Sequence, residues 1–502
     1  MSIWSKPITP QKEFFWIAFL LIVIAEALSL ITYQGAPALE PYVFVLVIAG
    51  TLYLAFQNIE YGLLIAFGEL FIGSFGHLFG LEVGSFQISI RIALFLLLNA
   101  MFFLHRLYTR SYPFRTSRYF WVSNAFFALI VYGFVLAFVN QHARLDIFHD
   151  ADAYLFFAYF PIAFAAFRTK ESRDRLAQVF CAALLWLGFQ TALVLFAFSH
   201  HFRDAMEVLY LWIRDARIGE ITRVAGDFYR IFFQSYIFAL VGIFIFAIQF
   251  FRGKTVVPGT AHTSFASRRG LWLYTLSAFL VLESLSRSFW FGGVIAVLVM
   301  LGTLLAFRTP WGVVGRGILR MIGGTILALA LIFAIVNFPF PPKGPPILLA
   351  DIFGGRAVAL FGEAAASSRW QLLPAMWQEI KAAPLLGHGF GKTITYKTDD
   401  PRYLAEDPTG MRTTFAFEWG YLDLWLKLGL PGALVYGWLI VLILRQGWRR
   451  IKQFPQATEY GLWLGVIALL AAHFFTPYLN HPLGIGLLIL AAAWFDSHEH
   501  VK

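Results

Sequence analysis

The amino-acid sequence predicts an all-α protein: a polytopic bundle of about 14 transmembrane helices with one large, partly helical loop on the non-cytoplasmic side. Of its 502 residues, 59% are hydrophobic and only 14% are charged, whereas about a quarter of the residues of a soluble domain are charged. Long apolar stretches recur along the chain, and lysine and arginine gather in alternate connections between them. These observations indicate a membrane protein, because so few polar residues cannot cover a chain of this length in water.

The predicted spans follow one another along the whole chain. Crossing the hydrocarbon core takes about 20 mostly apolar residues in a helix. The first half of the sequence contains candidate spans at residues 13–33, 41–57, 61–80, 87–105, 119–139, 153–167 and 176–199. The second half contains candidate spans at residues 230–250, 271–286, 289–307, 317–338, 419–443, 459–476 and 482–496.

The positive charges indicate the orientation of these spans. Short cytoplasmic loops collect lysine and arginine, because positive charge resists translocation. The connections near 34–40, 81–86 and 477–481 contain neither residue. The connections on the opposite side contain clusters of arginine, three of them with lysine as well, at residues 106–118, 168–175, 252–269, 308–320 and 445–452. This alternation predicts that both termini are cytoplasmic.

The longest connection divides the chain into three regions. Residues 1–338 are expected to form a transmembrane bundle of about 11 spans, residues 339–418 a large outer loop, and residues 419–502 about three further spans. The loop opens with PFPPKGPP, a sequence that favours a stiff, extended segment. Its eight basic residues are balanced by eight acidic residues, so the loop is not expected to bind nucleic acid.

Within the loop, residues 367–382 are predicted to form an amphipathic helix that lies on the outer membrane surface. Its apolar face consists of Trp370, Leu373, Trp377 and Ile380. Ser367 or Ser368 can cap this helix, which places Arg369 in the first turn, where free backbone N–H groups favour an anion. Pro384 ends the helix. A flexible turn is expected after it, at Gly387, Gly389 and Gly391.

Arginines at the outer ends of the predicted spans are functional candidates, because a charge at this depth is costly unless it is paired or hydrated. Arg287 lies in LESLSRSFWFGG, where apolar segments on both sides hold it at the outer boundary. Arg223 and Arg230 stand at the outer entrance of the span at 230–250, with Asp227 between them. The alternative for each arginine is a surface residue whose side chain reaches lipid headgroups or solvent.

Glu418 lies where the large loop returns to the membrane. Phe417 and Trp419 flank it, and partial desolvation between aromatic rings makes a carboxylate a better proton acceptor. Arginines suit phosphate, because each planar guanidinium donates two hydrogen bonds at once. Several arginines beside one carboxylate therefore suit deprotonation of a hydroxyl next to a phosphate. The alternative is that Glu418 only caps or anchors the following helix.

Other charged residues fall inside or near the spans. Asp423 and Lys427 have the spacing of an ion pair on one helix face. Arg91, near the outer end of the fourth span, is a further outer-face candidate, whereas Glu69 and Glu283 are expected to pair inside the bundle. The sequence contains no P-loop, HExxH or CxxC motif and has one cysteine, so neither a metal nor another cofactor is expected.

Three stretches in the second half resemble the O-antigen ligase and O-antigen polymerase superfamily of bacterial cell-surface glycan assembly. SLSRSFWFGG resembles the family's serine–arginine junction between two spans. SSRWQLLPAMWQEIKAAPLLGHGFG resembles its loop signature, in which an Arg-led helix precedes a Pro-Leu-Leu-Gly-x-Gly turn. EWGYLDLWLKLGLPG resembles its closing stretch, and RVAGDFYR is more weakly similar to another arginine-containing stretch. The order and spacing of these motifs carry the resemblance.

The resemblance implies a metal-independent, inverting glycosyltransferase on the periplasmic face of the bacterial cytoplasmic (inner) membrane. The donor would be a glycan linked to a polyprenyl diphosphate. Arg287 and Arg369 would bind the diphosphate, assisted by Arg223 or Arg230, and the catalytic residues would be Glu418, Arg287 and Arg369. The expected partners are the lipid-linked oligosaccharide and membrane lipid, with a chain-length regulator and a flippase as further candidates, and no nucleic acid.

One position departs from the family pattern. Counting back from Gly429, ligases usually place a histidine where this sequence has Glu418. This difference favours a polymerase of O-antigen or exopolysaccharide repeat units. The first alternative is an O-antigen ligase that transfers the glycan to lipid A–core or to protein. The second is a non-enzymatic transporter of polysaccharide or lipid, which would place its charges near the middle of the membrane, whereas here they collect at one face.

Overall fold

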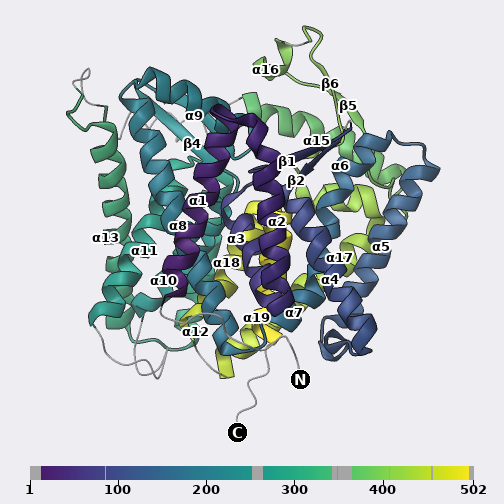
Figure 1. The fold of residues 1–502 in the computed structure, drawn as a ribbon, viewed down its shortest axis with the longest axis horizontal. Helices are drawn as coiled ribbons and strands as arrows, with labels where there is room; N and C mark the ends of the chain where they lie inside the picture. Colours follow the sequence, from purple (N-terminus) through teal and green to yellow (C-terminus); the bar gives the residue numbers. More distant parts are fainter. Residues whose placement is uncertain are drawn as a thin grey trace.

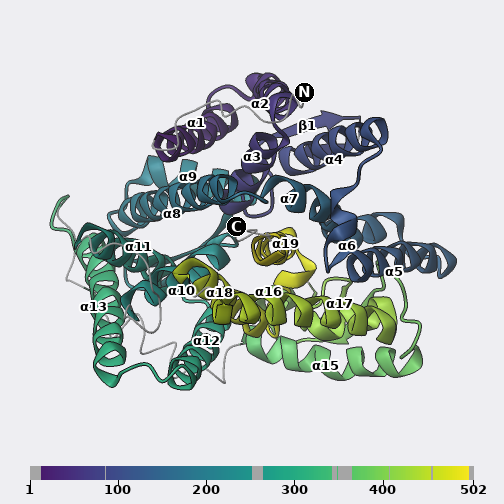
Figure 2. The ribbon, with the colours of Figure 1, turned by 90° about the horizontal axis from the view of Figure 1, so that it is seen from below.

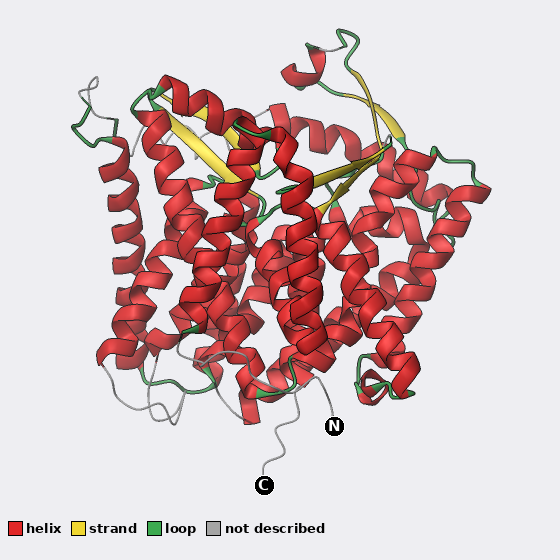
Figure 3. Cartoon of the chain, viewed as in Figure 1, coloured by secondary structure: helices red, strands yellow, loops and turns green. Residues whose placement is uncertain are grey.

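A computed structural model of the protein describes residues 13–84, 86–251, 264–341, 347–348, 364–405, 407–453 and 456–496. The chain is 76% helical with few strands, which confirms the prediction of an all-α membrane protein. Long helices run side by side in one bundle, and the strands are gathered toward one end of it (Figure 1, Figure 3).

Eight helices in the described part of the chain are long and apolar enough to cross a membrane. They are α1 (Phe14–Gln34), α2 (Glu40–Gln57, after the short helix η1, Pro37–Leu39), α4 (Ile90–Thr109), α5 (Phe120–Val139), α8 (Lys170–Ser199), α12 (Arg287–Ala306), α13 (Trp311–Val336) and α17 (Gly420–Gln453). Three shorter apolar helices accompany them: α10 (Tyr236–Ala247, continued by η4, Ile248–Phe251), α18 (Ala457–His473) and α19 (Pro482–Asp496).

The remaining predicted spans correspond to helices that are shorter or more polar. These are α3 (Ile59–Ile72), α7 (Phe160–Ala166) and α11 (Ser264–Glu283). The two turns of α7 are far too short to cross a bilayer alone, and α11 contains two arginines and a glutamate. The predicted count of about 14 spans is therefore not confirmed.

Two predicted spans differ from the structure in kind. The stretch 153–167 is broken: α6 (Arg144–Leu155) ends in it, the 3-10 helix η3 (Phe156–Tyr159) follows, and α7 begins only then. Pro161 stands in the first turn of α7, where proline is tolerated because it lacks a backbone N–H. The stretch 230–250 opens as a strand, β4 (Phe228–Phe233), which pairs with β3 (Gly219–Ala225).

Glycines set the spacing of the helices at the centre of the bundle, where α10, α18 and α19 are almost wholly buried (Figure 2). A β carbon at Gly461 of α18 would lie 2.3 Å from the Cα of Ile245 in α10. A β carbon at Gly292 of α12 would lie 2.5 Å from the carbonyl oxygen of Ala468 in α18. Small residues let membrane helices approach this closely, so α18 packs tightly against both α10 and α12.

Short elements cover the end of the bundle that the charge pattern predicts to be the outer one. Three antiparallel two-stranded sheets lie there: β1 (Gly80–Val83) with β2 (Phe86–Ser89), β3 with β4, and β5 (Ile394–Lys397) with β6 (Met411–Thr414). The helices α9 (Arg203–Asp215) and α15 (Ala364–Ala382) lie crosswise to the long helices at this end (Figure 1). The small helix α16 (Pro401–Leu404) and its hairpin project beyond it (Figure 1).

The helix predicted at 367–382 exists as α15, with a different start. Because α15 already includes Ala364, Ser367 and Ser368 lie inside the helix and cannot cap it. Arg369 accordingly lies beyond the first turn, and the predicted placement of this arginine among free N–H groups is wrong.

The buried side of α15 also differs from the predicted apolar face. The residues packed into the protein are Leu372, Met376 and Ile380, each at most 2% exposed. Trp370 and Trp377 are 59% and 41% exposed, although one side of each ring contacts Trp419 or Trp425. α15 thus has two apolar faces, one against the protein and one with exposed tryptophans, a residue type enriched at membrane–water interfaces.

The glycine turn after α15 is tightly packed rather than flexible. Gly387, Gly389 and Gly391 have φ of 71°, 82° and 72°, a region that favours glycine. A β carbon at Gly389 would lie 2.5 Å from the backbone nitrogen of Ala137 in α5. The turn reaches α17 as well, where Gly429 (φ 67°, ψ −173°) breaks the helix in two, and the Leu430 N–H donates to the Pro384 carbonyl at 3.0 Å.

Candidate active site

Arg369 and Glu418 meet at the outer end of the bundle. Arg369 comes from α15 and Glu418 from the segment two residues before α17, and the Arg369 Nε donates a hydrogen bond to the Glu418 Oε2. Their side chains are 33% and 42% exposed, so both remain accessible to a substrate. The structure therefore brings together a guanidinium and a carboxylate that stand 49 positions apart in the chain.

The residue next to Glu418 fixes this pair. The Trp419 indole Nε1 donates to the backbone carbonyl of Arg369 at 2.9 Å, and the ring centroid of Trp419 lies 5.0 Å from that of Trp370. Trp419 is only 4% exposed and packs in a small apolar cluster with Leu372, Met376 and other residues of α15 and α17. The start of α17 thus holds the backbone and the side chain of Arg369 at once.

Arg287 is the first residue of α12 and is partly exposed. The next residue, Ser288, accepts a hydrogen bond from Thr476 at 3.0 Å. Phe475 is the residue before Thr476. Its ring centroid lies 5.5 Å from that of Phe291 in α12 and 5.9 Å from that of Trp419. The first turns of α12 and the segment with Glu418 therefore contact the same turn after α18, which links Arg287 indirectly to the Arg369–Glu418 pair.

Arg230 supports the segment that precedes Arg287. From β4, its Nε donates to the carbonyl oxygen of Ser284 at 2.6 Å, three residues before Arg287. Its guanidinium lies 4.7 Å from the Phe232 ring centroid, and its Nη1 is 3.9 Å from a Glu220 carboxylate oxygen. The side chain is 17% exposed. Arg230 is thus placed beside the α11–α12 junction with part of its hydrogen-bonding capacity already used.

Arg223 lies at the turn of the same hairpin and is 63% exposed. Its Nε donates to the Gly226 carbonyl at 2.6 Å, and its guanidinium lies 3.8 Å from the Asp227 carboxylate. Asp227 also contacts the imidazole of His201 at 3.0 Å. These contacts hold Arg223 within its own hairpin, whereas Arg230 reaches across to the junction before α12.

Lys427, Asp423 and Asp150 form a buried ion cluster, of which only the Lys427–Asp423 pair was predicted. Lys427 forms the expected pair with Asp423, and it also pairs with Asp150 of α6. Asp150 accepts the Gly391 N–H at 2.7 Å, and Asn480 donates to Asp423 at 2.5 Å. Asp150 was missed because it stands just before the broken stretch at 153–167.

A second buried pair confirms that Glu69 is paired inside the bundle. Arg91 donates two hydrogen bonds of 2.9 Å to Glu69 and a third, of 2.6 Å, to the Ser74 carbonyl. His77 lies nearby in the connection after α3, and burial together with Arg217 and Arg91 lowers its pKa from 6.5 to about 4. This imidazole is therefore neutral near pH 7.

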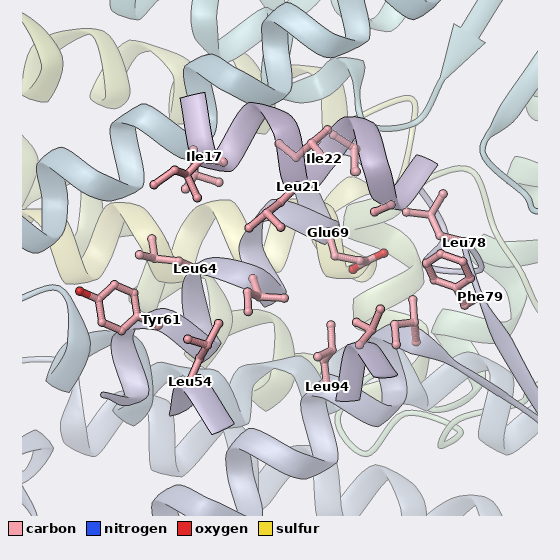
Figure 4. Close-up of a pocket in the computed structure, with 18 of the residues that line it drawn as sticks. Ile17, Leu21, Ile22, Leu54, Tyr61, Leu64, Glu69, Leu78, Phe79 and Leu94 are labelled. Carbon is pink, nitrogen blue, oxygen red and sulfur yellow. The ribbon is translucent and has the colours of Figure 1, made fainter. Parts of the chain in front are cut away.

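Two cavities are prominent, and neither is lined by Arg287, Arg369 or Glu418. The larger, of about 320 Å³, lies among α1, α2, α3 and α4 (Figure 4). The smaller, of about 270 Å³, lies among α8, α10, α18 and α19. The Arg369–Glu418 pair is a surface-accessible site at the end of the bundle rather than the wall of either cavity.

A multi-pass helical bundle with an accessible arginine–carboxylate pair at one end defines a membrane protein with a polar site at the membrane boundary. Residues 272–437, about a third of the chain, match the family model described as O-antigen ligase. The match supports the resemblance to the O-antigen ligase and O-antigen polymerase superfamily that the sequence motifs indicated.

The family match contains three of the five predicted site residues. Arg287, Arg369 and Glu418 lie inside it, whereas Arg223 and Arg230 precede it. The family is associated with glycosyl transfer in membrane glycan processing. Neither the curated proteins nor the solved structures include a match to the chain.

Proposed function

We propose that the protein is a membrane glycosyltransferase that takes its glycan from a polyprenyl-diphosphate carrier on the periplasmic face of the inner membrane. Its reaction would lengthen O-antigen or exopolysaccharide chains. The observation that carries this proposal is the accessible Arg369–Glu418 pair, which lies within the O-antigen ligase match and beside the turn that α12 also contacts. A cation and a proton acceptor at one membrane boundary suit a phosphate-linked donor and a hydroxyl acceptor.

In the proposed reaction, Glu418 accepts the proton of an acceptor sugar hydroxyl. The resulting oxygen attacks the anomeric carbon of the donor glycan from the side opposite the diphosphate, so the configuration inverts. The new C–O bond forms as the bond to the diphosphate breaks, and the electron pair leaves with the lipid diphosphate. Arg287 and Arg369 stabilise this departing charge, and Arg230 keeps the segment before Arg287 in place.

The test removes the charged groups one at a time. Glu418→Gln removes the proton acceptor, and Arg287→Ala removes one cation, so each is expected to abolish glycan lengthening in cells while the protein still inserts in the membrane. Glu207→Gln and Arg203→Ala, both on the exposed side of α9, serve as matched controls and should leave the polymer unchanged. Polymer of normal length in either Glu418→Gln or Arg287→Ala would contradict the assignment.

The second candidate function is ligation, which the description of the matched family favours. Deletion of the gene separates the two reactions. Loss of a polymerase leaves lipid A–core with a single repeat unit, whereas loss of a ligase leaves bare core and accumulated lipid-linked polymer. If the product is a secreted polysaccharide, the length of that polymer is measured instead.

A further inference from the structure

The larger cavity is a long apolar groove at the edge of the bundle. It runs from Tyr61 at one end to Leu78 and Phe79 at the other, and side chains of α1 line one wall (Figure 4). The other wall comes from α2, α3 and α4, with one residue of α8. All of its lining residues are apolar or aromatic apart from Gly68 and Glu69.

Glu69 does not make this groove a charged site. Its carboxylate is turned toward the cavity (Figure 4) but accepts two hydrogen bonds of 2.9 Å from Arg91. Both side chains are less than 10% exposed, so the pair is internal and its charges cancel. The Glu69–Arg91 pair therefore does not attract an ionic ligand, and the apolar lining of the groove favours a hydrocarbon ligand.

The dimensions of the groove suit one flexible chain. The α1 residues that line it extend from Phe14 to Ala25, about 16 Å along a helix that rises ~1.5 Å per residue. An elongated apolar groove of this length suits an extended hydrocarbon chain better than a compact ligand.

The location of the groove at the periphery of the bundle indicates which ligand occupies it. Apolar cavities do not hold water, and an empty groove forfeits the dispersion contacts of its lining. α1, α2 and α4 are candidate membrane spans, and α1 and α2 stand at the periphery of the bundle (Figure 2), so lipid is the surrounding solvent. We propose that the groove is a binding site for one acyl chain of a membrane phospholipid, which completes the packing of α1 against α2, α3 and α4.

The polyprenyl chain of a glycan donor does not fit this location. α15, which carries Arg369, lies at the edge of the bundle opposite α1 and α2 (Figure 1, Figure 2). A donor whose diphosphate reaches Arg369 would have to cross the whole bundle to place its tail in the groove. The site is therefore independent of the proposed glycosyl transfer.

The experiment fills the groove and measures retained lipid. A β carbon at Gly68, which lines the groove, meets only the Val179 side chain, at 3.5 Å. Gly68→Leu therefore places a side chain in the groove without a backbone clash. Gly50→Leu on α2 is the matched control, because Gly50 is exposed and a β carbon there meets nothing within 4 Å. Ala18→Leu fills the groove from the opposite wall.

The full-length protein is purified in detergent, washed, and analysed by mass spectrometry for bound lipid. Wild type and Gly50→Leu are expected to retain about one phospholipid per chain and to gain thermal stability when dioleoyl phosphatidylethanolamine is added. Gly68→Leu and Ala18→Leu are expected to lose both properties. Equal retention in all four proteins, or retention of polyprenyl phosphate in place of phospholipid, would overturn the proposal. Neither readout requires glycosyl transfer.

Discussion

At the scale of single residues, the Arg369–Glu418 pair and the ion cluster around Lys427 have opposite environments. The Arg369–Glu418 pair is about one-third to two-fifths exposed, and exposed pairs contribute only about 0–1 kcal/mol to stability. The Lys427 side chain and its two carboxylate partners are 2–7% exposed. Charges in such a place are tolerated only in mutual contact. The Arg369–Glu418 pair is therefore available for a chemical role, whereas the ion cluster around Lys427 stabilises the fold.

This difference predicts the effect of removing Lys427. Lys427→Met leaves Asp150 and Asp423 buried without their cation, which should destabilise the protein by about 3–5 kcal/mol. The measurement is thermal unfolding in detergent. Lys381→Met, at an exposed position on α15, should change stability by no more than about 0.5 kcal/mol. Similar unfolding temperatures for the two variants would show that the buried cluster does not stabilise the fold.

At the scale of elements, the junction between the glycine turn and the break in α17 is a tight backbone contact near the site. Gly429 has a backbone conformation that is open in practice only to glycine. A β carbon there would lie 2.2 Å from the Leu385 carbonyl oxygen. The break in α17 and the turn after α15 therefore depend on each other.

Gly429→Ala should consequently destabilise the protein, by roughly 1–3 kcal/mol from backbone strain and further through the clash. Gly437→Ala is the matched control on the same element, because a β carbon at Gly437 meets nothing within 4 Å. In a regular helix that change is expected to stabilise by roughly 0.5–1 kcal/mol. Unfolding temperatures of both variants check the prediction, and a stable Gly429→Ala protein would mean that the break can relax.

The elements also show what sequence patterns can predict. Apolar runs located the long helices, because each run must bury its backbone hydrogen bonds internally. Their bounds were less accurate: α8 and α13 begin six residues before the predicted spans, and α17 ends ten residues after its span. The apolar pattern failed in segments whose structure depends on tertiary contacts. Apolar residues of β4 read as helix, although they pair with β3. The pattern on α15 predicted the face with Trp370 and Trp377, but not the second face, on which Leu372 and Met376 are buried.

The same limit applies to the candidate site. The meeting of Arg369 with Glu418 could be predicted, because family motifs and the shared outer boundary pointed to both residues. The second partner of Lys427 could not be predicted, because Asp150 stands 277 positions away and no local pattern joins them. The use of Arg230 to hold Ser284 also depends on a contact across 54 positions.

At the scale of the whole molecule, the arrangement is polarised. The three small sheets, α9 and α15 lie at one end of the bundle (Figure 1). α4 follows β2 and runs away from that end for 20 residues, about 30 Å at ~1.5 Å per residue. Arg106 lies in its last turn, which agrees with a cytoplasmic position for the first basic connection.

Labelling of single cysteines checks this orientation. In a Cys181→Ala background, Ala405→Cys near the β5–β6 hairpin is expected to react with a membrane-impermeant maleimide in intact cells. Tyr108→Cys, at a position 87% exposed near the end of α4, is expected to react only after the membrane that holds the protein is permeabilised. Both positions are exposed, so a difference in labelling shows that they lie on opposite sides of the membrane. Labelling of Tyr108→Cys in intact cells would reverse the assigned orientation.

The contact between Trp419 and the backbone of Arg369 has a mechanical consequence. The indole hydrogen bond and the ion pair tie the same stretch of α15 to two adjacent residues, Glu418 and Trp419. If an incoming glycan tilts the surface helix, the cation and the base travel with it as one rigid unit. The spacing between them is then preserved while the whole pair adjusts its height above the bilayer.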